Sequence, residues 1–80
     1  MGLADLPVAN AAAHAKAFCR RGWEIQPKRG KGSHLILTKP GHPAVISLPG
    51  HGPVKRALLM QQLKHAGLTV EEYLKAFRGQ

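Results

Sequence analysis

The chain has 80 residues, which is enough for one domain and excludes a second catalytic domain. Apolar residues make up 44% of it and are spread along its length, so we expect an ordered globule with a thin core. Twelve Lys and Arg against four Asp and Glu give a formal net charge of +8. That charge favours a polyanionic or acidic partner, with nucleic acid as the first candidate and a merely soluble basic surface as the alternative.

The single cysteine, Cys19, rules out a disulfide framework or a zinc cluster within the chain and fits a reducing compartment. We expect Cys19 to be a small core residue of the first helix. The chain does not start with a basic segment followed by an apolar stretch, and no run approaches the roughly 20 apolar residues of a membrane span. These features predict a soluble cytoplasmic protein with no membrane partner.

The N-terminal quarter of the chain is predicted to hold one helix. Residues 1–9 are expected to form an extended lead, because Pro7 disfavours helix just before it. A helix is expected over residues 11–21, with Asn10 as its N-cap and Gly22 as its C-terminal cap. Its apolar positions recur at helical spacing and should form one buried face: Ala11, Ala15, Phe18 and Cys19.

The middle of the chain is predicted to be an antiparallel meander. Its three strands cover residues 23–26, 35–37 and 44–48. Pro27 ends the first strand or marks an edge, and residues 40–43 form a turn by composition. Alternation along the second strand places His34 and Ile36 on one face, opposite Leu35 and Leu37.

Two further helices are predicted at the C-terminal end. Residues 54–66 carry a stripe of Leu59, Leu63 and Ala66, and Gly67 ends that helix. Thr69 and Glu72 form a capping box that begins a last short helix, which runs to about Phe77. The order of elements predicts an α+β domain over residues 1–80 with α-β-β-β-α topology plus a short C-terminal helix. The longer helices should cover one face of a three-stranded antiparallel sheet, a layout that resembles the double-stranded RNA-binding domain.

His34 is the residue that most suggests chemistry. No phosphate-binding loop, nucleophile elbow or carboxylate pair is present, and the five histidines lack metal-ligand spacing, so no metal or cofactor is expected. An imidazole titrates near neutrality and can move protons in RNA cleavage without a metal, while cations stabilise charge on the phosphate. The cations around His34 in the sequence are Lys28, Arg29, Lys31 and Lys39. On the residues alone, a structural or incidental role for His34 is the more common outcome, and the cations also fit an ordinary solvated loop.

Several motifs together resemble the HicA toxin family over nearly the whole chain. They are Gly22-Trp23, Gly32-Ser33-His34 at the head of a strand, Pro49-Gly50-His51 after the third strand, and the segment from Lys64 to Tyr73. The resemblance implies a double stranded RNA-binding-like fold and a ribosome-independent mRNA interferase of a type II toxin–antitoxin system. It also implies inhibition by a cognate HicB-type antitoxin.

The resemblance assigns the catalytic role to His34. Gly32 and Ser33 would then shape the entry of the strand, since glycine permits backbone conformations that other residues resist. His51 matches a frequent family position, and we interpret it as a loop residue that touches phosphate or antitoxin, with a second catalytic group as the alternative. The residues expected to bind RNA are Lys28, Arg29, Lys31, Gly32, Ser33, Lys39 and His51.

Two segments depart from the family pattern. The run from Leu35 to Leu37 is wholly aliphatic, so stacking of bases on this strand is not expected. Gln61-Gln62 stands where many relatives have an aliphatic residue, which should thin the core. The predicted function is an endoribonuclease toxin that cuts mRNA without a metal, with His34 as general acid–base. The alternatives are a non-catalytic RNA-binding module that uses the same basic surface and an interaction domain for an acidic protein.

Overall fold

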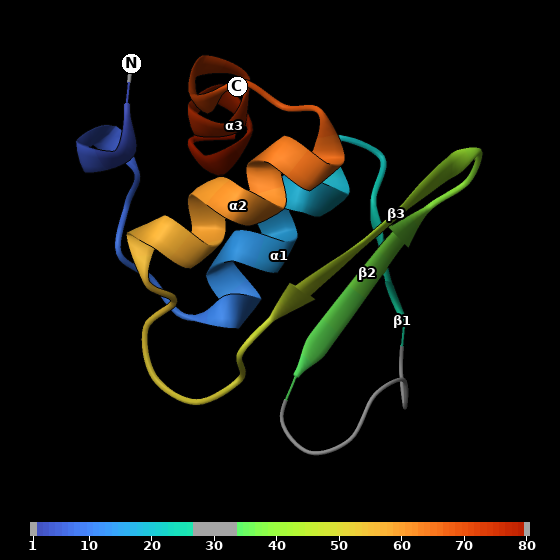
Figure 1. The fold of residues 1–80 in the computed structure, drawn as a ribbon, viewed down its shortest axis with the longest axis horizontal. Helices are drawn as coiled ribbons and strands as arrows, with labels where there is room; N and C mark the ends of the chain where they lie inside the picture. The colour runs from blue at the N-terminus through green and yellow to red at the C-terminus, as the bar shows by residue number, and fades with distance from the viewer. Residues whose placement is uncertain (1, 27–33, 80) are drawn as a thin grey trace.

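The computed structural model describes residues 2–26 and 34–79 and confirms the predicted α+β order of elements (Figure 1). In chain order these are a 3-10 helix η1 (Leu3–Asp5), α1 (Ala11–Arg20), β1 (Glu24–Gln26), β2 (Leu35–Lys39), β3 (His42–Leu48), α2 (Arg56–Ala66) and α3 (Val70–Phe77). None of the helices in the described ranges is long and apolar enough to span a membrane.

The N-terminal lead is not extended throughout, which corrects the prediction for residues 1–9. Leu3–Asp5 form the short helix η1, and the Gly2 N–H donates to the Asp5 carboxylate at 2.8 Å. Pro7 restricts mainly the residue directly before it. Leu6 accordingly has an extended backbone, and the helical turn ends there.

The sheet is an antiparallel meander in the order β1-β2-β3. Leu37 pairs with Ile25 on one side and with Ile46 on the other. Leu37 and Ile46 are fully buried beneath the helices, whereas Ile36 and Val45 alternate with them on the opposite face and keep solvent contact. α1 packs on β1 and β2, and α2 packs on β3, so the helices cover one face as predicted (Figure 1).

The predicted turn over residues 40–43 is shorter than expected. Only Pro40 and Gly41 form the turn, with Gly41 in the left-handed region at φ 79°, and β3 already begins at His42. Pro43 lacks the N–H of a regular ladder, and the register shifts in this stretch as a β-bulge. The Ala44 N–H finds a substitute acceptor in the His42 ring nitrogen Nδ1 at 3.2 Å. The edge position of β3 and the bulge together explain why proline is tolerated in this strand.

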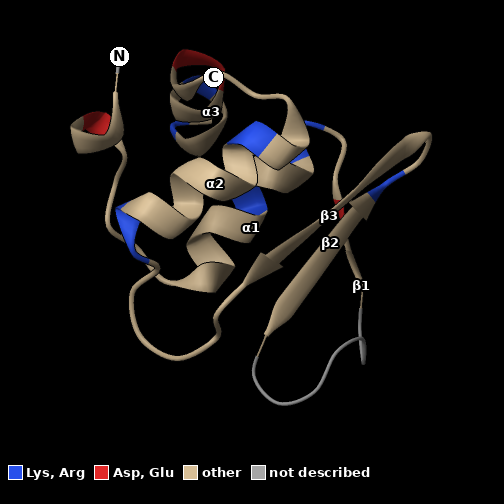
Figure 2. Ribbon diagram, viewed as in Figure 1, with Lys and Arg blue, Asp and Glu red and all other residues tan. Residues whose placement is uncertain are grey.

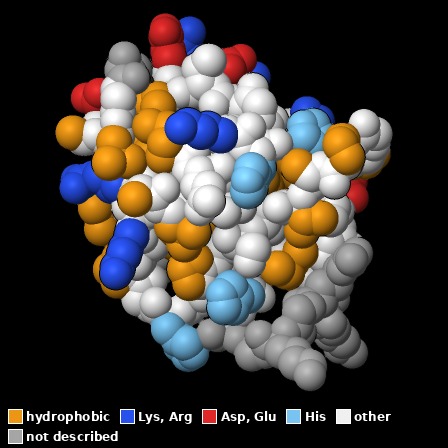
Figure 3. Space-filling model, viewed as in Figure 1, with side chains coloured by type: hydrophobic (Ala, Val, Ile, Leu, Met, Phe, Trp, Pro, Cys, Tyr) orange, Lys and Arg blue, Asp and Glu red, His pale blue; other side chains and the backbone are white. Residues whose placement is uncertain are grey.

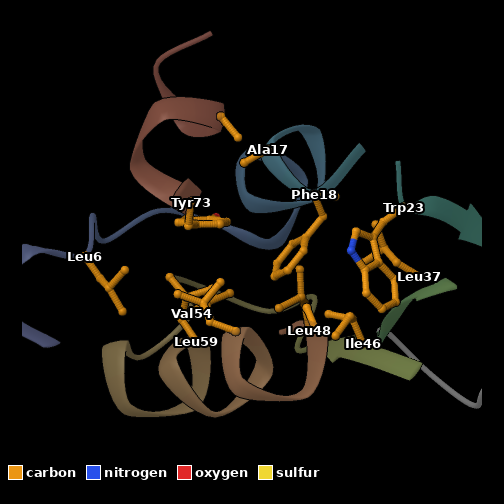
Figure 4. Close-up of a cluster of buried hydrophobic side chains, with 14 of the residues drawn as sticks. Leu6, Ala17, Phe18, Trp23, Leu37, Ile46, Leu48, Val54, Leu59 and Tyr73 are labelled. Carbon is orange, nitrogen blue, oxygen red and sulfur yellow. The ribbon is translucent and has the colours of Figure 1, made fainter. Parts of the chain in front are cut away.

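Phe18 lies at the centre of the core, between the helices and the sheet (Figure 4). Its ring is 5.3 Å from that of Tyr73 and 6.3 Å from that of Trp23, between centroids. Cys19 is exposed, which corrects its assignment to the core. Because α3 packs on the side of α1 that carries His14 and Ala17, the buried arc of α1 turns away from Cys19.

Gln62 is a buried polar residue, and it makes a hydrogen bond at the position where the sequence predicted a thinner core. Its side-chain oxygen accepts the Ser47 N–H at 3.1 Å, while Gln61 is exposed. Ser47 lies on the edge strand β3, where an unpaired backbone N–H would otherwise face α2. The polar side chain therefore ties α2 to the sheet by a hydrogen bond.

Candidate functional site

Three of the predicted site residues lie in the part of the chain that the structure describes: His34, Lys39 and His51. The other five, Lys28, Arg29, Lys31, Gly32 and Ser33, lie outside the described residues.

His34 is exposed and directly precedes β2. Leu35 packs against the core and Leu37 is fully buried, so alternation directs the other set of side chains to the open face of the sheet. By this alternation His34 lies on the same open face as Ile36. The imidazole is thus accessible to a large substrate at the entry of the strand.

The β2–β3 register brings His51 to the same end of the sheet as His34. Leu35 pairs with Leu48, His34 precedes Leu35, and the loop over residues 49–53 follows Leu48. In Figure 1 this loop runs from the end of β3 toward α2, beside the start of β2. His51 is also exposed, and the face shown in Figure 3 has histidine side chains at its lower edge as well as elsewhere. The fold therefore places two histidines that are far apart in the sequence at the same end of the sheet.

Lys39 lies at the opposite end of β2 from His34, so it does not belong to the group of cations expected around that histidine. A strand advances about 3.3 Å per residue, which separates the two backbone positions by about 17 Å. The Lys39 side chain lies beside Gly22 instead, where a Cβ would be 3.2 Å from the Lys39 Cε. Neighbours along an extended strand quickly become distant in space, which is why the sequence spacing was misleading.

Two cations that were not predicted follow the His51 loop at the beginning of α2. Lys55 is the N-cap residue and Arg56 the first helical residue, and both are exposed. The positive end of the helix dipole disfavours cations at this position, and the first turn of α2 has no acidic residue to offset them. Arg56 ties α2 to the N-terminal segment, because its Nε donates to the Leu6 carbonyl at 2.8 Å. Helix stability does not account for Lys55, and a cation at a helix N-terminus without an acidic neighbour was the signal in the sequence that could have revealed it.

None of the four acidic residues lies in β2, in β3 or in the loop that follows β3. Asp5 is in η1, Glu24 is in β1, and Glu71 and Glu72 are in the first turn of α3 (Figure 2). The start of α2 carries Lys55 and Arg56, although η1 with Asp5 also contacts α2. The molecule is thus electrostatically uneven, and its histidine-bearing end has the sign that attracts phosphate groups.

His14 is a further histidine that sequence reasoning did not single out, and its setting differs from that of His34. It is fully buried, and its Nδ1 forms a hydrogen bond with the Tyr73 hydroxyl. Its Nε2 has no hydrogen-bond partner among the described residues. Burial lowers the pKa of His14, partly offset by the Ala9 carbonyl, and so favours the neutral ring. His14 links α1 to α3 and has no access to a substrate.

The exposed histidines His34 and His51 can transfer protons, and the nearby Lys55 can bind phosphate. These are the two requirements for cleaving an RNA backbone. Within residues 2–26 and 34–79, no three His, Cys, Asp or Glu side chains lie close enough together to share a metal ion.

Comparison with known proteins gives one family. The model of the family described as "HicA toxin of bacterial toxin-antitoxin" matches residues 14–68, which is more than half of the chain. That range contains α1 from His14 onward, the sheet, α2, and the exposed histidines His34 and His51. A search of the curated proteins gives no match. The chain therefore belongs to the HicA family, the toxins of bacterial toxin–antitoxin systems, which generally cleave mRNA.

Proposed function

We propose that this protein is an endoribonuclease that cleaves mRNA in the cytoplasm without a metal ion and that His34 transfers a proton at the scissile phosphate. The observation that carries this proposal is the exposure of His34 at the entry of β2. A buried imidazole such as that of His14 would be unable to reach a polymer.

The reaction is transesterification within the RNA. A base removes the proton of a 2′-hydroxyl, the 2′-oxygen forms a bond to phosphorus, and the bond from phosphorus to the 5′-oxygen breaks as that oxygen is protonated. The products are a 2′,3′-cyclic phosphate and a 5′-hydroxyl. His34 makes one of the two proton transfers, and cations stabilise the charge that develops on the phosphate oxygens.

The residues proposed to bind RNA come from two segments of the sequence, the one between β1 and β2 and the loop after β3. They are Lys28, Arg29, Lys31, Gly32 and Ser33 together with His51. The net charge of +8 gives the protein a strong, salt-dependent attraction for the RNA backbone. A cognate HicB-type antitoxin with an acidic surface would cover His34 and compete directly with RNA for the same charges.

The test is cleavage of RNA by the purified protein in the presence of a chelator. We expect wild-type protein to produce fragments and His34→Ala to lose at least about 10²-fold in rate, as for removal of a general acid or base. RNA affinity and thermal unfolding of the variant should stay close to wild type. His65→Ala is the matched control, because His65 is another exposed histidine but lies in the last turn of α2.

Other outcomes would overturn the proposal. A His34→Ala variant that cuts at the original rate would remove His34 from the reaction. Salt-sensitive binding by the wild type without any fragments would instead indicate a non-catalytic RNA-binding module. Neither binding nor cleavage would indicate a domain that recognises an acidic protein.

A further inference from the structure

We propose that His51 is the second proton-transfer group and forms an acid–base pair with His34. This inference rests on the proposed function, because it concerns the same cleavage reaction. The pair is created by the tertiary structure, since the two residues are separated in the sequence by two strands.

The sheet register determines how close the two histidines lie. Leu35 and Leu48 form the last pair of the β2–β3 ladder, with His34 directly before Leu35 and Pro49 directly after Leu48. Paired Cα atoms lie about 5 Å apart and successive Cα atoms 3.8 Å apart, so the Cα atoms of His34 and His51 lie no more than about 20 Å apart. Both side chains are exposed at this end of the sheet, so both are accessible to a bound RNA strand.

The loop that carries His51 is anchored at both of its ends. Leu48 is fully buried and paired with Leu35, and the Val54 N–H donates to the Ala9 carbonyl at 2.8 Å. Pro53 forms an isolated β-bridge with Asn10 next to that bond. His51 is exposed in the short stretch between these anchors. Such anchoring holds a catalytic side chain near its working position before the substrate arrives.

The reaction needs two groups, because the attacking 2′-oxygen and the departing 5′-oxygen lie on opposite sides of phosphorus in an in-line displacement. The second group must exchange a proton near neutral pH, which histidine does most readily. Arginine stays protonated, and lysine normally does too. Arg56, the nearest described guanidinium in the sequence, already donates through Nε to the Leu6 carbonyl at 2.8 Å. Neither Lys nor Arg at this end is therefore as well suited as His51 to the second proton transfer.

The other histidines are placed where they cannot share the phosphate with His34. His14 is fully buried between α1 and α3. His42 begins β3 at the far end of the sheet, with its ring 5.0 Å from that of Trp23 between centroids. His65 lies in the last turn of α2. Only His51 among the remaining histidines lies at the same end of the sheet as His34.

A substrate with a better leaving group separates proton transfer from simple phosphate binding. The cleavage site is first mapped on all-oxygen RNA, and sulfur then replaces the bridging 5′-oxygen at that linkage. The 2′-oxygen attacks phosphorus, the phosphorus–sulfur bond breaks, and the thiolate leaves without needing a proton. A variant that lacks the acid should regain activity on this substrate, whereas one that lacks the base should not.

We expect His51→Ala, like His34→Ala, to cut all-oxygen RNA at least about 10²-fold more slowly than wild type. On the sulfur substrate exactly one of the two variants should return to near the wild-type rate, and the rescued variant identifies the acid. His51→Asn keeps a hydrogen-bond donor but transfers no proton near neutral pH, so it should be as slow as His51→Ala. His65→Ala serves as the control with full activity on both substrates.

Three results would overturn the pair. They are a wild-type rate for His51→Ala, recovery of all-oxygen cleavage by His51→Asn, and equal slowing of both alanine variants on both substrates. None of these results concerns the proposed role of His34 alone. That role, and with it the proposed function, would be overturned by a His34→Ala variant with full activity. Thermal unfolding of His51→Ala should match wild type, as expected for an exposed side chain.

Discussion

His14 and His34 carry the same side chain in opposite environments. His14 is sealed between α1 and α3 with its ring bonded to the Tyr73 hydroxyl, whereas His34 is exposed at the entry of β2. Burial fixes the protonation of the first and makes it part of the core. Exposure leaves the second accessible to a phosphate group. The comparison shows that the surroundings, and not the residue type, separate a structural histidine from a catalytic candidate in this fold.

The largest expected effects come from exchanging the two histidines for alanine in separate variants. His34→Ala should lose at least about 10²-fold in cleavage rate and little stability. His14→Ala should lose about 3 kcal/mol of unfolding free energy, because it leaves a cavity and an unpaired Tyr73 hydroxyl. Cleavage per folded molecule should stay at the wild-type level. Urea unfolding measures the loss of stability, and cleavage assays measure the rate. A His14→Ala variant that folds normally but is inactive would contradict a purely structural role for His14.

A second contrast concerns pH. Burial lowers the pKa of His14 from 6.5, so the unfolded chain binds more protons than the folded one in the interval between the two pKa values. Stability from this group is complete above about pH 6.5 and decreases as the pH falls toward the folded value, by at most about 1.4 kcal/mol per pH unit. The groups around the ring are the Tyr73 hydroxyl, the Phe77 ring and the Ala9 carbonyl.

None of those neighbours titrates between pH 5 and 7, and burial moves the pKa of Tyr73 further upward. The measurement is chemical denaturation of the wild type and of a His14→Gln variant across this range. The variant should lose part of the acid sensitivity that the wild type has. Identical pH profiles for the two proteins would show that His14 is not the group responsible.

The smallest expected effect contrasts the two ends of the sheet. Lys55→Ala, next to the His51 loop, should weaken RNA binding several-fold. The slope of log affinity against log salt concentration should fall by about 1, as for the loss of one phosphate contact. Lys39→Ala should have a smaller effect, because Lys39 lies at the far end of β2. Affinity titrations at several salt concentrations compare the two directly. Equal losses would mean that RNA follows the whole length of the sheet.

Features that depend on local interactions could be predicted from the sequence. The Thr69–Glu72 capping box is present, with the Glu72 N–H donating to the Thr69 hydroxyl at 3.0 Å. Asn10 accepts the Ala13 N–H, and Gly67 ends α2 in the left-handed region at φ 73°. Residues within four positions of each other make these contacts, so the pattern of residue types is sufficient to find them.

The error at Cys19 had its origin in packing between segments that are distant in the sequence. Cys19 was assigned to the core because it follows the apolar spacing of α1. The helix α3, which lies at the other end of the sequence, covers the adjacent side of α1 and brings His14 into the core instead. Helical periodicity identifies a face to within about one residue position, and the neighbouring helix decides which side of that face is buried.

The sequence by itself determined the order and type of the elements, their caps and the net charge, because each follows from residue types over short spans. It also indicated His34 through the motif Gly32-Ser33-His34. Only the tertiary structure decided which of the candidate site residues lie at the same end of the sheet. Strand pairing between β2 and β3 brings the His51 loop to His34 and carries Lys39 away from it. Such contacts depend on register and on long-range packing, which no local pattern of residues specifies.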